Sequence, residues 1–396
     1  MRLLVTAARL TTAAVLALSP MAAGTASASV PEPSPAPLLK ITHAIPGHYI
    51  VTLGRSLDPT HFAHSAGLKP KFTYTRAING FATALTPRQL RAVRASRGVR
   101  SVQEDGWAGA APVRSKGGQP KSPANSWGLD RIDQRALPLD NNFSAHGSGE
   151  GVTAYIVDSG IDFTHPDFGG RARAGFDAIG DGRGAADCNG HGTHVAGTVG
   201  GSTFGVARKV NLVSVRVLNC ESRGSWSGII AGFDWVARNA HQPAVLNASL
   251  GGDRVAAVND AATAVSDQGV LPVISAGNAN IDACRISPAS ATRVVTVGAT
   301  NRFDEETDFS NWGECLDIYA PGKDIVSAKL GGGSVALDGT SMAAPHVAGV
   351  AALYKAEHPN ALPTEVAGFL SDKSTKDVIE NLSGHGPNRL LFTNGL

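Results

Sequence analysis

Charge of either sign is scarce in this sequence, and the two signs nearly balance. Charged residues make up 17% of the 396 positions, and the formal net charge is +2. A protein that binds nucleic acid or an anionic membrane through electrostatics carries a marked excess of Lys and Arg, so neither function is expected here. The 46 glycines and 42% hydrophobic residues are typical of a packed, loop-rich globular protein.

Beyond the N-terminus, the sequence lacks an apolar run long enough to span a bilayer. At the N-terminus, Arg2 and Arg9 form a positive region ahead of an apolar stretch at 10–18, and residues 26–28 (Ala-Ser-Ala) have the small-residue pattern of a signal-peptidase site. The alternative, a membrane anchor, needs a longer stretch. We predict a cleaved signal peptide over 1–28, a secreted, extracellular product and no membrane association after cleavage.

Cysteine is also rare, with four residues at Cys188, Cys220, Cys284 and Cys315. An even number in a secreted chain favours two disulfides, and three pairings are open. The alternative is a zinc site formed by Cys188, His191 and His194, which lie close together in sequence. Short metal-like motifs often arise by chance, so the disulfides are favoured.

Between the predicted signal peptide and residue 121, two linkers enclose a small domain. A Pro-rich spacer at 29–39 is expected to be extended and unpacked. Residues 40–108 show a β-α-β-β-α-β pattern, typical of a ferredoxin-like α+β unit. The predicted strands and helices are 49–53, 58–66, 72–75, 80–85, a helix from Pro87 with Thr86 as N-cap, and 99–104. A second linker at 109–121 is rich in Gly, Pro, Ser and Lys and is suited to proteolysis, with the new N-terminus between Pro112 and Ser122.

Residues 122–396 form the predicted main domain. Apolar runs at 152–157, 210–217, 244–250, 270–276 and 294–297 read as buried parallel strands, and 225–240 and 255–268 read as helices. This alternation predicts an α/β fold with a mostly parallel sheet. Functional groups in such folds lie at the carboxyl ends of strands, where Asp158 and Asn278 are found.

Three motifs carry candidate catalytic groups. They are YIVDSG at 155–160, NGHGTHVAG at 189–197 and GTSMAAPHVAG at 339–349. A serine hydroxyl needs a base and an oxyanion-binding group to act as a nucleophile. Asp158, His191 and Ser341 follow one another in the chain order of subtilisin, and the turn at Ser341 lacks the G-x-S-x-G pattern of lipases and esterases.

These motifs resemble the subtilisin-like serine proteases (subtilases, peptidase family S8), above all the proteinase K and aqualysin branch. The resemblance implies a subtilisin-like three-layer fold over 122–396. Residues 40–108 resemble an inhibitor I9-type propeptide through Tyr49-Ile50-Val51 and residues 78–82 (INGFA). The family's properties imply a secreted, monomeric endopeptidase made as a self-processing zymogen. It would act on proteins and peptides without a catalytic cofactor, and its propeptide would serve as intramolecular chaperone and inhibitor.

The resemblance also assigns roles to residues. Ser341 is the nucleophile, His191 the general base and later the general acid, and Asp158 the group that orients His191. Asn278 and the Ser341 main-chain N–H form the oxyanion hole. Taken singly, Ser341 would read as a helix N-cap and Asn278 as a turn residue, and the three motifs together overturn that interpretation.

Further site residues follow from the same resemblance. The substrate-binding cleft would consist of Ser249, Leu250, Gly251, Ser275, Ala276, Gly277 and Trp226, with 222–224 as the opposite edge. Recognition would be β-augmentation, with broad cleavage after apolar or aromatic residues because the pocket wall at 275–277 is small and neutral. A core position is the alternative for Trp226.

Structural Ca²⁺ and the disulfide pairing are likewise implied. The calcium ligands would be Asp317 with the carbonyls of Thr292 and Val294, and, in a second site, Asp130, Asp133, Gln134, Asp140 and Asn142, because hard cations prefer oxygen. The alternative for each carboxylate is a solvated surface or a helix cap. The disulfides would be Cys188–Cys220 and Cys284–Cys315.

Overall fold

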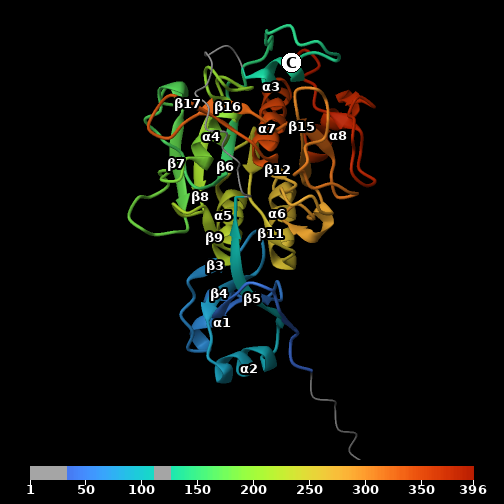
Figure 1. The fold of residues 1–396 in the computed structure, drawn as a ribbon. Helices are drawn as coiled ribbons and strands as arrows, with labels where there is room; N and C mark the ends of the chain where they lie inside the picture. Colours follow the sequence, from blue (N-terminus) through green and yellow to red (C-terminus); the bar gives the residue numbers. More distant parts are fainter. Residues whose placement is uncertain (1–33, 111–125) are drawn as a thin grey trace, which may run out of the picture. The chain divides into compact units, whose positions relative to one another are not determined.

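The computed structural model describes residues 34–110 and 126–396 (Figure 1). Three predicted segments lie outside the described residues: the signal peptide, the spacer as far as residue 33, and the linker from residue 111 onward. The whole range predicted for the new N-terminus, 112–122, lies outside them as well. Within the described ranges, no helix is long and apolar enough to cross a membrane.

The N-terminal domain has the predicted β-α-β-β-α-β order with one added strand. Its sheet has the strand order β1-β5-β2-β4-β3. The elements are β1 (Leu38–Leu39), β2 (Ala44–Leu53), α1 (Pro59–Ser65), β3 (Phe72–Tyr74), β4 (Gly80–Ala84), α2 (Pro87–Ala95) and β5 (Val99–Gly109). Thr86 caps α2 as predicted, since its hydroxyl accepts from the N–H of Gln89 and the Gln89 side chain accepts from the N–H of Thr86.

The end of the Pro-rich spacer is packed, so the expectation of an unpacked segment is wrong for Ala36 to Leu39. β1 pairs in parallel with β5, and the N–H of Ala36 donates to the carbonyl of Arg94 at 2.7 Å. The open edge of β5 offers unpaired main-chain groups, and residues 38–39 satisfy them. Composition alone does not reveal such a pairing.

The C-terminal domain is built around a nine-stranded sheet with the order β18-β19-β15-β14-β12-β10-β6-β8-β7. Figure 1 labels β7, β8, β6, β12 and β15 of this sheet. All neighbouring strands are parallel except β18 and β19. The strands are β6 (Thr153–Asp158), β7 (Ala172–Asp177), β8 (Asn211–Arg216), β10 (Ala244–Ala248), β12 (Leu271–Ser275), β14 (Val295–Thr300), β15 (Ile318–Pro321), β18 (Thr375–Lys376) and β19 (Arg389–Leu390). The five predicted strands are therefore all present, and the α/β prediction is confirmed.

Helices and short strands complete this domain. The helices are α3 (Trp127–Ile132), η1 (Pro166–Phe168), α4 (His191–Gly200), α5 (Trp226–Asn239), α6 (Ala256–Asp267), η2 (Ala283–Arg285), α7 (Thr340–Glu357) and α8 (Pro363–Lys373). The short strands are β9 (Arg223–Ser225), β11 (Gly252–Asp253), β13 (Ile286–Ser287), β16 (Ile325–Ala328) and β17 (Ser334–Leu337).

The sheet separates two hydrophobic cores. Along β6, Ala154 and Ile156 pack with α4 and α7, whereas Tyr155 and Val157 pack with α5 and α6. Successive side chains of a strand point to opposite faces, so an apolar run without alternation is what a sheet covered by helices on both faces requires. The three layers leave the carboxyl ends of β6 and β12 at one edge of the sheet, where Asp158 and the Gly277–Asn278 turn lie.

Candidate active site

Asp158 and His191 meet inside the domain. Asp158 is the last residue of β6, and His191 is the first of α4, after Gly190 at φ +103°. Asp158 Oδ1 lies 2.8 Å from His191 Nδ1, and their side chains are 0% and 5% exposed. Burial lowers the pKa of His191, but the charge of Asp158 and the hydrogen bond to it outweigh burial, so the pKa is raised above the usual 6.5.

A second carboxylate, Asp187, holds the turn that carries His191. Asp187 Oδ1 accepts from Ser159 Oγ at 2.9 Å and from the N–H groups of Asn189 and Gly190 at 2.9 and 3.0 Å. Its Oδ2 accepts from the Thr193 hydroxyl at 2.6 Å. Asp187 was not among the predicted site residues, and since no helix was predicted from His191, no capping signal pointed to it.

Ser341 lies in the first turn of α7 and is fully buried in this structure. Its Oγ donates to the carbonyl of Ser249 at 3.3 Å. His191 Nε2 is buried and has no hydrogen-bond partner in the part of the chain that the structure describes. Catalytic hydrogen bonds are often long or poorly aligned before substrate binds, so an unpaired His191 Nε2 is consistent with a role as the base for Ser341.

Asn278 approaches the same helix end. Its Oδ1 accepts from both the N–H and the hydroxyl of Thr340, each at 2.8 Å. Its Nδ2 is buried and unpaired among the described residues. Gly339 lies so close that a Cβ there would be 2.9 Å from Nδ2. An oriented, unsatisfied amide beside a helix N-terminus can donate to an oxygen on which negative charge develops.

An extended strand occupies the cleft between the two predicted substrate-binding edges. Beyond the predicted end at residue 104, β5 continues to Gly109 and pairs in antiparallel fashion with β9. On its other side, Gly109 exchanges two main-chain hydrogen bonds with Gly251, of 3.2 and 2.9 Å. The N–H of Ala110 donates to the carbonyl of Ser222 at 3.3 Å. Both edges thus add to one strand, as β-augmentation predicts.

Of the remaining predicted cleft residues, Trp226 lies beside this strand. Trp226 is 0% exposed, and its ring lies within 4 Å of the positions that Cβ atoms would take on Gly106 and Gly252. It therefore belongs to a hydrophobic core and also borders β5. Ser275 and Ala276 are buried at the end of β12, and Gly277 has φ +102°, a backbone conformation that favours glycine.

Buried polar contacts hold the N-terminal domain on α5. Asp234 Oδ1 accepts three main-chain N–H groups, from Thr75, Arg76 and Ala77, at 2.7 to 2.9 Å. Asp105 accepts from the N–H and hydroxyl of Ser227 at 3.0 and 2.6 Å. Burial raises the pKa of Asp105 even though these hydrogen bonds favour its charged form.

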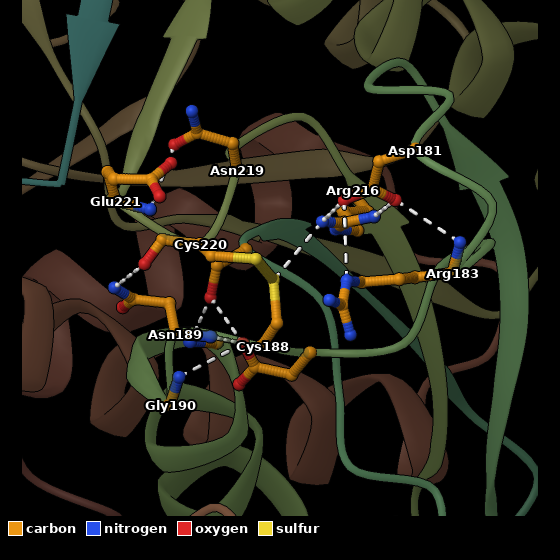
Figure 2. The surroundings of a disulfide bond; sticks show 12 residues. Asp181, Arg183, Cys188, Asn189, Gly190, Arg216, Asn219, Cys220 and Glu221 are labelled. Carbon is orange, nitrogen blue, oxygen red and sulfur yellow. Dashed lines mark hydrogen bonds and ion pairs between the residues drawn. A yellow bond between two sulfur atoms is a disulfide. The ribbon is translucent and has the colours of Figure 1, made fainter.

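The disulfides follow the pairing that the resemblance implies. Cys188 bonds Cys220, and Cys284 bonds Cys315. Figure 2 shows that the first one ties the loop before His191 to the loop before β9, and Asn189 Nδ2 donates to the carbonyl of Cys220 at 2.9 Å. A bond that closes 32 residues stabilises by about 3–4 kcal/mol in the chain-entropy model. It therefore links one edge of the cleft to the candidate base.

The zinc alternative is not supported. Among the described residues, the one group of Asp, Glu, His and Cys ligand atoms that lie close enough together to hold a metal is Asp181, Cys188 and Cys220, and both cysteines are disulfide-bonded. His194 Nε2 lies 3.0 Å from the carbonyl of Ile325. Burial lowers the pKa of His194 to about 3, as expected for a neutral packing histidine.

The two predicted calcium sites differ in their geometry. Asp317 Oδ2 accepts from the Thr296 N–H at 2.8 Å. Arg293, between Thr292 and Val294, has φ +58°, so the chain turns sharply between the two predicted carbonyl ligands. The carbonyl of Thr292 accepts from the Thr263 hydroxyl at 2.8 Å, so this predicted ligand has a partner within the protein.

In the second set, most side-chain oxygens already accept main-chain N–H groups, and the carboxylates do not converge on one point. Burial raises the pKa of Asp133, and the negative charges of Asp130 and Asp140 raise it further. This loop, which also includes Gln134 and Asn142, fits a cation only if the carboxylates move closer together.

Comparisons with known proteins agree with this architecture. The model of the subtilase family matches residues 149–391, and that of the peptidase inhibitor I9 matches residues 48–107. The extracellular serine proteinase of Thermus sp. (strain Rt41A) is 43% identical over 408 residues, which cover 96% of this chain and 97% of the relative. The alkaline serine exoprotease A of Vibrio alginolyticus is 47% identical over 320 residues, 81% of this chain but only 59% of the relative's length.

A solved structure, described as a cold adapted subtilisin-like serine proteinase, superimposes with a TM-score of 0.67 at 49% identity. The match covers 68% of this chain and 98% of that one. The subtilisin-like fold predicted for the larger domain is thereby confirmed. With a family model that spans most of the chain and relatives above 40% identity, the chain belongs to the subtilase family.

Proposed function

We propose that this chain is a secreted serine endopeptidase made as a zymogen. The observation that carries the proposal is the buried Asp158–His191 pair at 2.8 Å. His191 lies on α4, which packs in one hydrophobic core with α7, the helix whose first turn carries Ser341. Secretion is supported by the N-terminal signal pattern and by a Thermus relative named as extracellular.

The mechanism follows from these groups. Ser341 Oγ attacks the substrate carbonyl carbon while His191 Nε2 takes the hydroxyl proton. Asn278 Nδ2 and the Ser341 N–H donate to the resulting oxyanion. His191 then passes the proton to the departing amine, which leaves an acyl ester on Ser341. Water, deprotonated by His191, hydrolyses the ester and restores the free serine.

The substrate would bind as β5 does, as a strand between β9 and Gly251. Main-chain pairing reads no side chains, so it favours broad specificity. The small, neutral wall at 275–277 favours apolar or aromatic residues on the acyl side of the cleaved bond. Because β5 occupies the same edges, the N-terminal domain would inhibit until the linker from residue 111 is cut, by the enzyme itself.

The test uses purified full-length protein, a fluorophosphonate that labels active serines, and mass analysis of the fragments. Labelling of Ser341 in a fragment that begins between residues 112 and 122, together with casein cleavage, would support the proposal. A processed fragment that takes up no label after its N-terminal domain has been digested away with trypsin would contradict the serine mechanism.

Activity should fall on acidification, with a midpoint above pH 6.5. His191 must be neutral to take the proton, and its pKa is raised, chiefly by the charge of Asp158 against the opposing effect of burial. Below that pKa the imidazole is protonated and the rate is lost. In Asp158→Asn, burial still lowers the pKa of His191 and the carboxylate charge that raised it is gone, so the midpoint of the activity profile should move to lower pH. The measurement is kcat/KM against pH, with exposed His385→Gln as the control that should match the parent.

Structural calcium would stabilise the enzyme without entering the chemistry. Asp317 with the carbonyls of Thr292 and Val294 would hold the ion. At 100 times its dissociation constant, calcium adds about 2.7 kcal/mol of stability. Chelation should lower the melting temperature of the parent and leave Asp317→Asn unaffected. Asp372→Asn, on the exposed face of α8, is the matched control, and a parent indifferent to chelation would exclude both sites.

A further inference from the structure

The proline in α7 leaves the carbonyl of Ser341 without its helical partner. In an α-helix, the carbonyl of residue i accepts from the N–H of residue i+4. For Ser341 that residue is Pro345, which has no N–H. The carbonyl is buried with the rest of Ser341, and an unpaired buried acceptor is costly.

A side chain from the neighbouring strand supplies the missing donor. Ser249 follows β10, and its Oγ donates to the Ser341 carbonyl at 2.9 Å. A serine hydroxyl has a single proton, and Asn247 Nδ2 donates to the same Oγ at 2.9 Å, which fixes the direction of that proton. Asn247 and Ser249 are both fully buried, so water does not compete for these bonds.

The segment from Ser249 to Gly251 also contacts the Ser341 side chain and the β5 strand. The carbonyl of Ser249 accepts from Ser341 Oγ at 3.3 Å. Two residues later, Gly251 exchanges main-chain hydrogen bonds with Gly109 of β5. From the sequence, Ser249 was predicted only as part of the substrate-binding edge, and neither its side chain nor Asn247 was predicted to have a role.

We propose that Asn247 and Ser249 are positioning residues for the nucleophile. Through the Ser341 carbonyl, they fix the turn from which Ser341 Oγ must reach both the substrate carbon and His191. They also tie that turn to the edge that aligns the substrate. This inference rests on the proposed function, since it assumes that Ser341 is the nucleophile.

We call the two hydrogen bonds from Asn247 to Ser249 and from Ser249 to the Ser341 carbonyl the relay. Four variants of the mature enzyme test it: Ser249→Ala, Ser249→Thr, Pro345→Ala and the double variant Ser249→Ala/Pro345→Ala. Active-site titration with the fluorophosphonate normalises kcat on a peptide substrate. Ser249→Ala should lower kcat roughly ten-fold or more while KM changes less than about two-fold, because the Gly251 main chain remains. Ser249→Thr keeps the hydroxyl and should restore most of kcat.

The double variant is the decisive measurement, because the alanine that replaces Pro345 would offer the helix N–H that proline lacks. It should recover kcat relative to Ser249→Ala, with the coupling taken from a cycle that includes Pro345→Ala alone. Ser214→Ala is the matched control: its Oγ donates to the Ala185 carbonyl at 2.7 Å in a buried strand, so its loss should affect stability and not kcat.

An unchanged kcat in Ser249→Ala, or a change confined to KM, would overturn the relay. So would a double variant that folds or turns over no better than Ser249→Ala. If Ser249→Ala fails to fold but the double variant is active, the Ser249 hydroxyl acts by donating to the Ser341 carbonyl, as proposed. Ser341→Ala separates a failure of the proposed function from a failure of the relay. If Ser341→Ala keeps its activity, the proposed function fails. If it loses activity while Ser249→Ala matches the parent, only the relay fails.

Discussion

Replacing Ser341 with alanine is expected to lower kcat on a peptide substrate by roughly 10⁶-fold, a magnitude that comes from subtilisin, a member of the same family. The variant keeps the buried Asp158–His191 pair and the Asn278 amide, but it has no atom that can form the acyl ester. Residual catalysis would come from oxyanion stabilisation and binding alone. KM should change little because the main-chain edges at β9 and Gly251 are untouched.

The same variant should accumulate with its N-terminal domain still attached. The β5 strand reaches Gly109 in the cleft, so the linker from residue 111 is the nearest substrate for self-processing. Ser371→Ala, on the half-buried surface of α8, is a control that should process and turn over like the parent. A Ser341→Ala protein that is cut at the linker when made alone would contradict self-processing, and one that still hydrolyses peptides would contradict the nucleophile.

Local patterns predicted the parts of the site that depend on local structure. Asp158 ends a buried apolar strand, and Ser341 is the second residue of the small-residue helix α7, whose N-cap is Gly339 at φ +147°, so their places in the fold were predictable. The five sheet strands were predictable for the same reason, because strands covered on both faces read as continuous apolar runs.

The contacts between distant segments were not predictable from local sequence. Trp107 to Gly109 shows no apolar alternation, yet it forms the end of β5 because β9 and Gly251 offer main-chain partners. Asp234 reads as an ordinary helix-surface carboxylate with Arg238 four residues on, and in the structure its Oδ1 accepts three N–H groups from residues 75–77. These contacts arise because the fold brings distant segments together, and hydrophobic periodicity in the sequence predicts only local structure.

Replacing Asn278 with alanine is expected to lower kcat by about 10²–10³-fold with a nearly constant KM. The Nδ2 group is buried and unpaired among the described residues, so its donor is available for the oxyanion that forms only after attack. An interaction made in the transition state but not with bound substrate appears in kcat. Exposed Asn360→Ala is the matched control and should match the parent in both constants.

Alanine also removes the acceptor that holds Thr340, since Asn278 Oδ1 accepts from its N–H and hydroxyl at 2.8 Å each. Asn278→Asp separates the two effects because it keeps that acceptor and loses the donor. If the lost donor causes the defect, Asn278→Asp should be at least as slow as Asn278→Ala, and the added negative charge near the oxyanion would slow it further. If kcat recovers in Asn278→Asp, the amide serves to hold the start of α7, and the oxyanion role would have to be withdrawn.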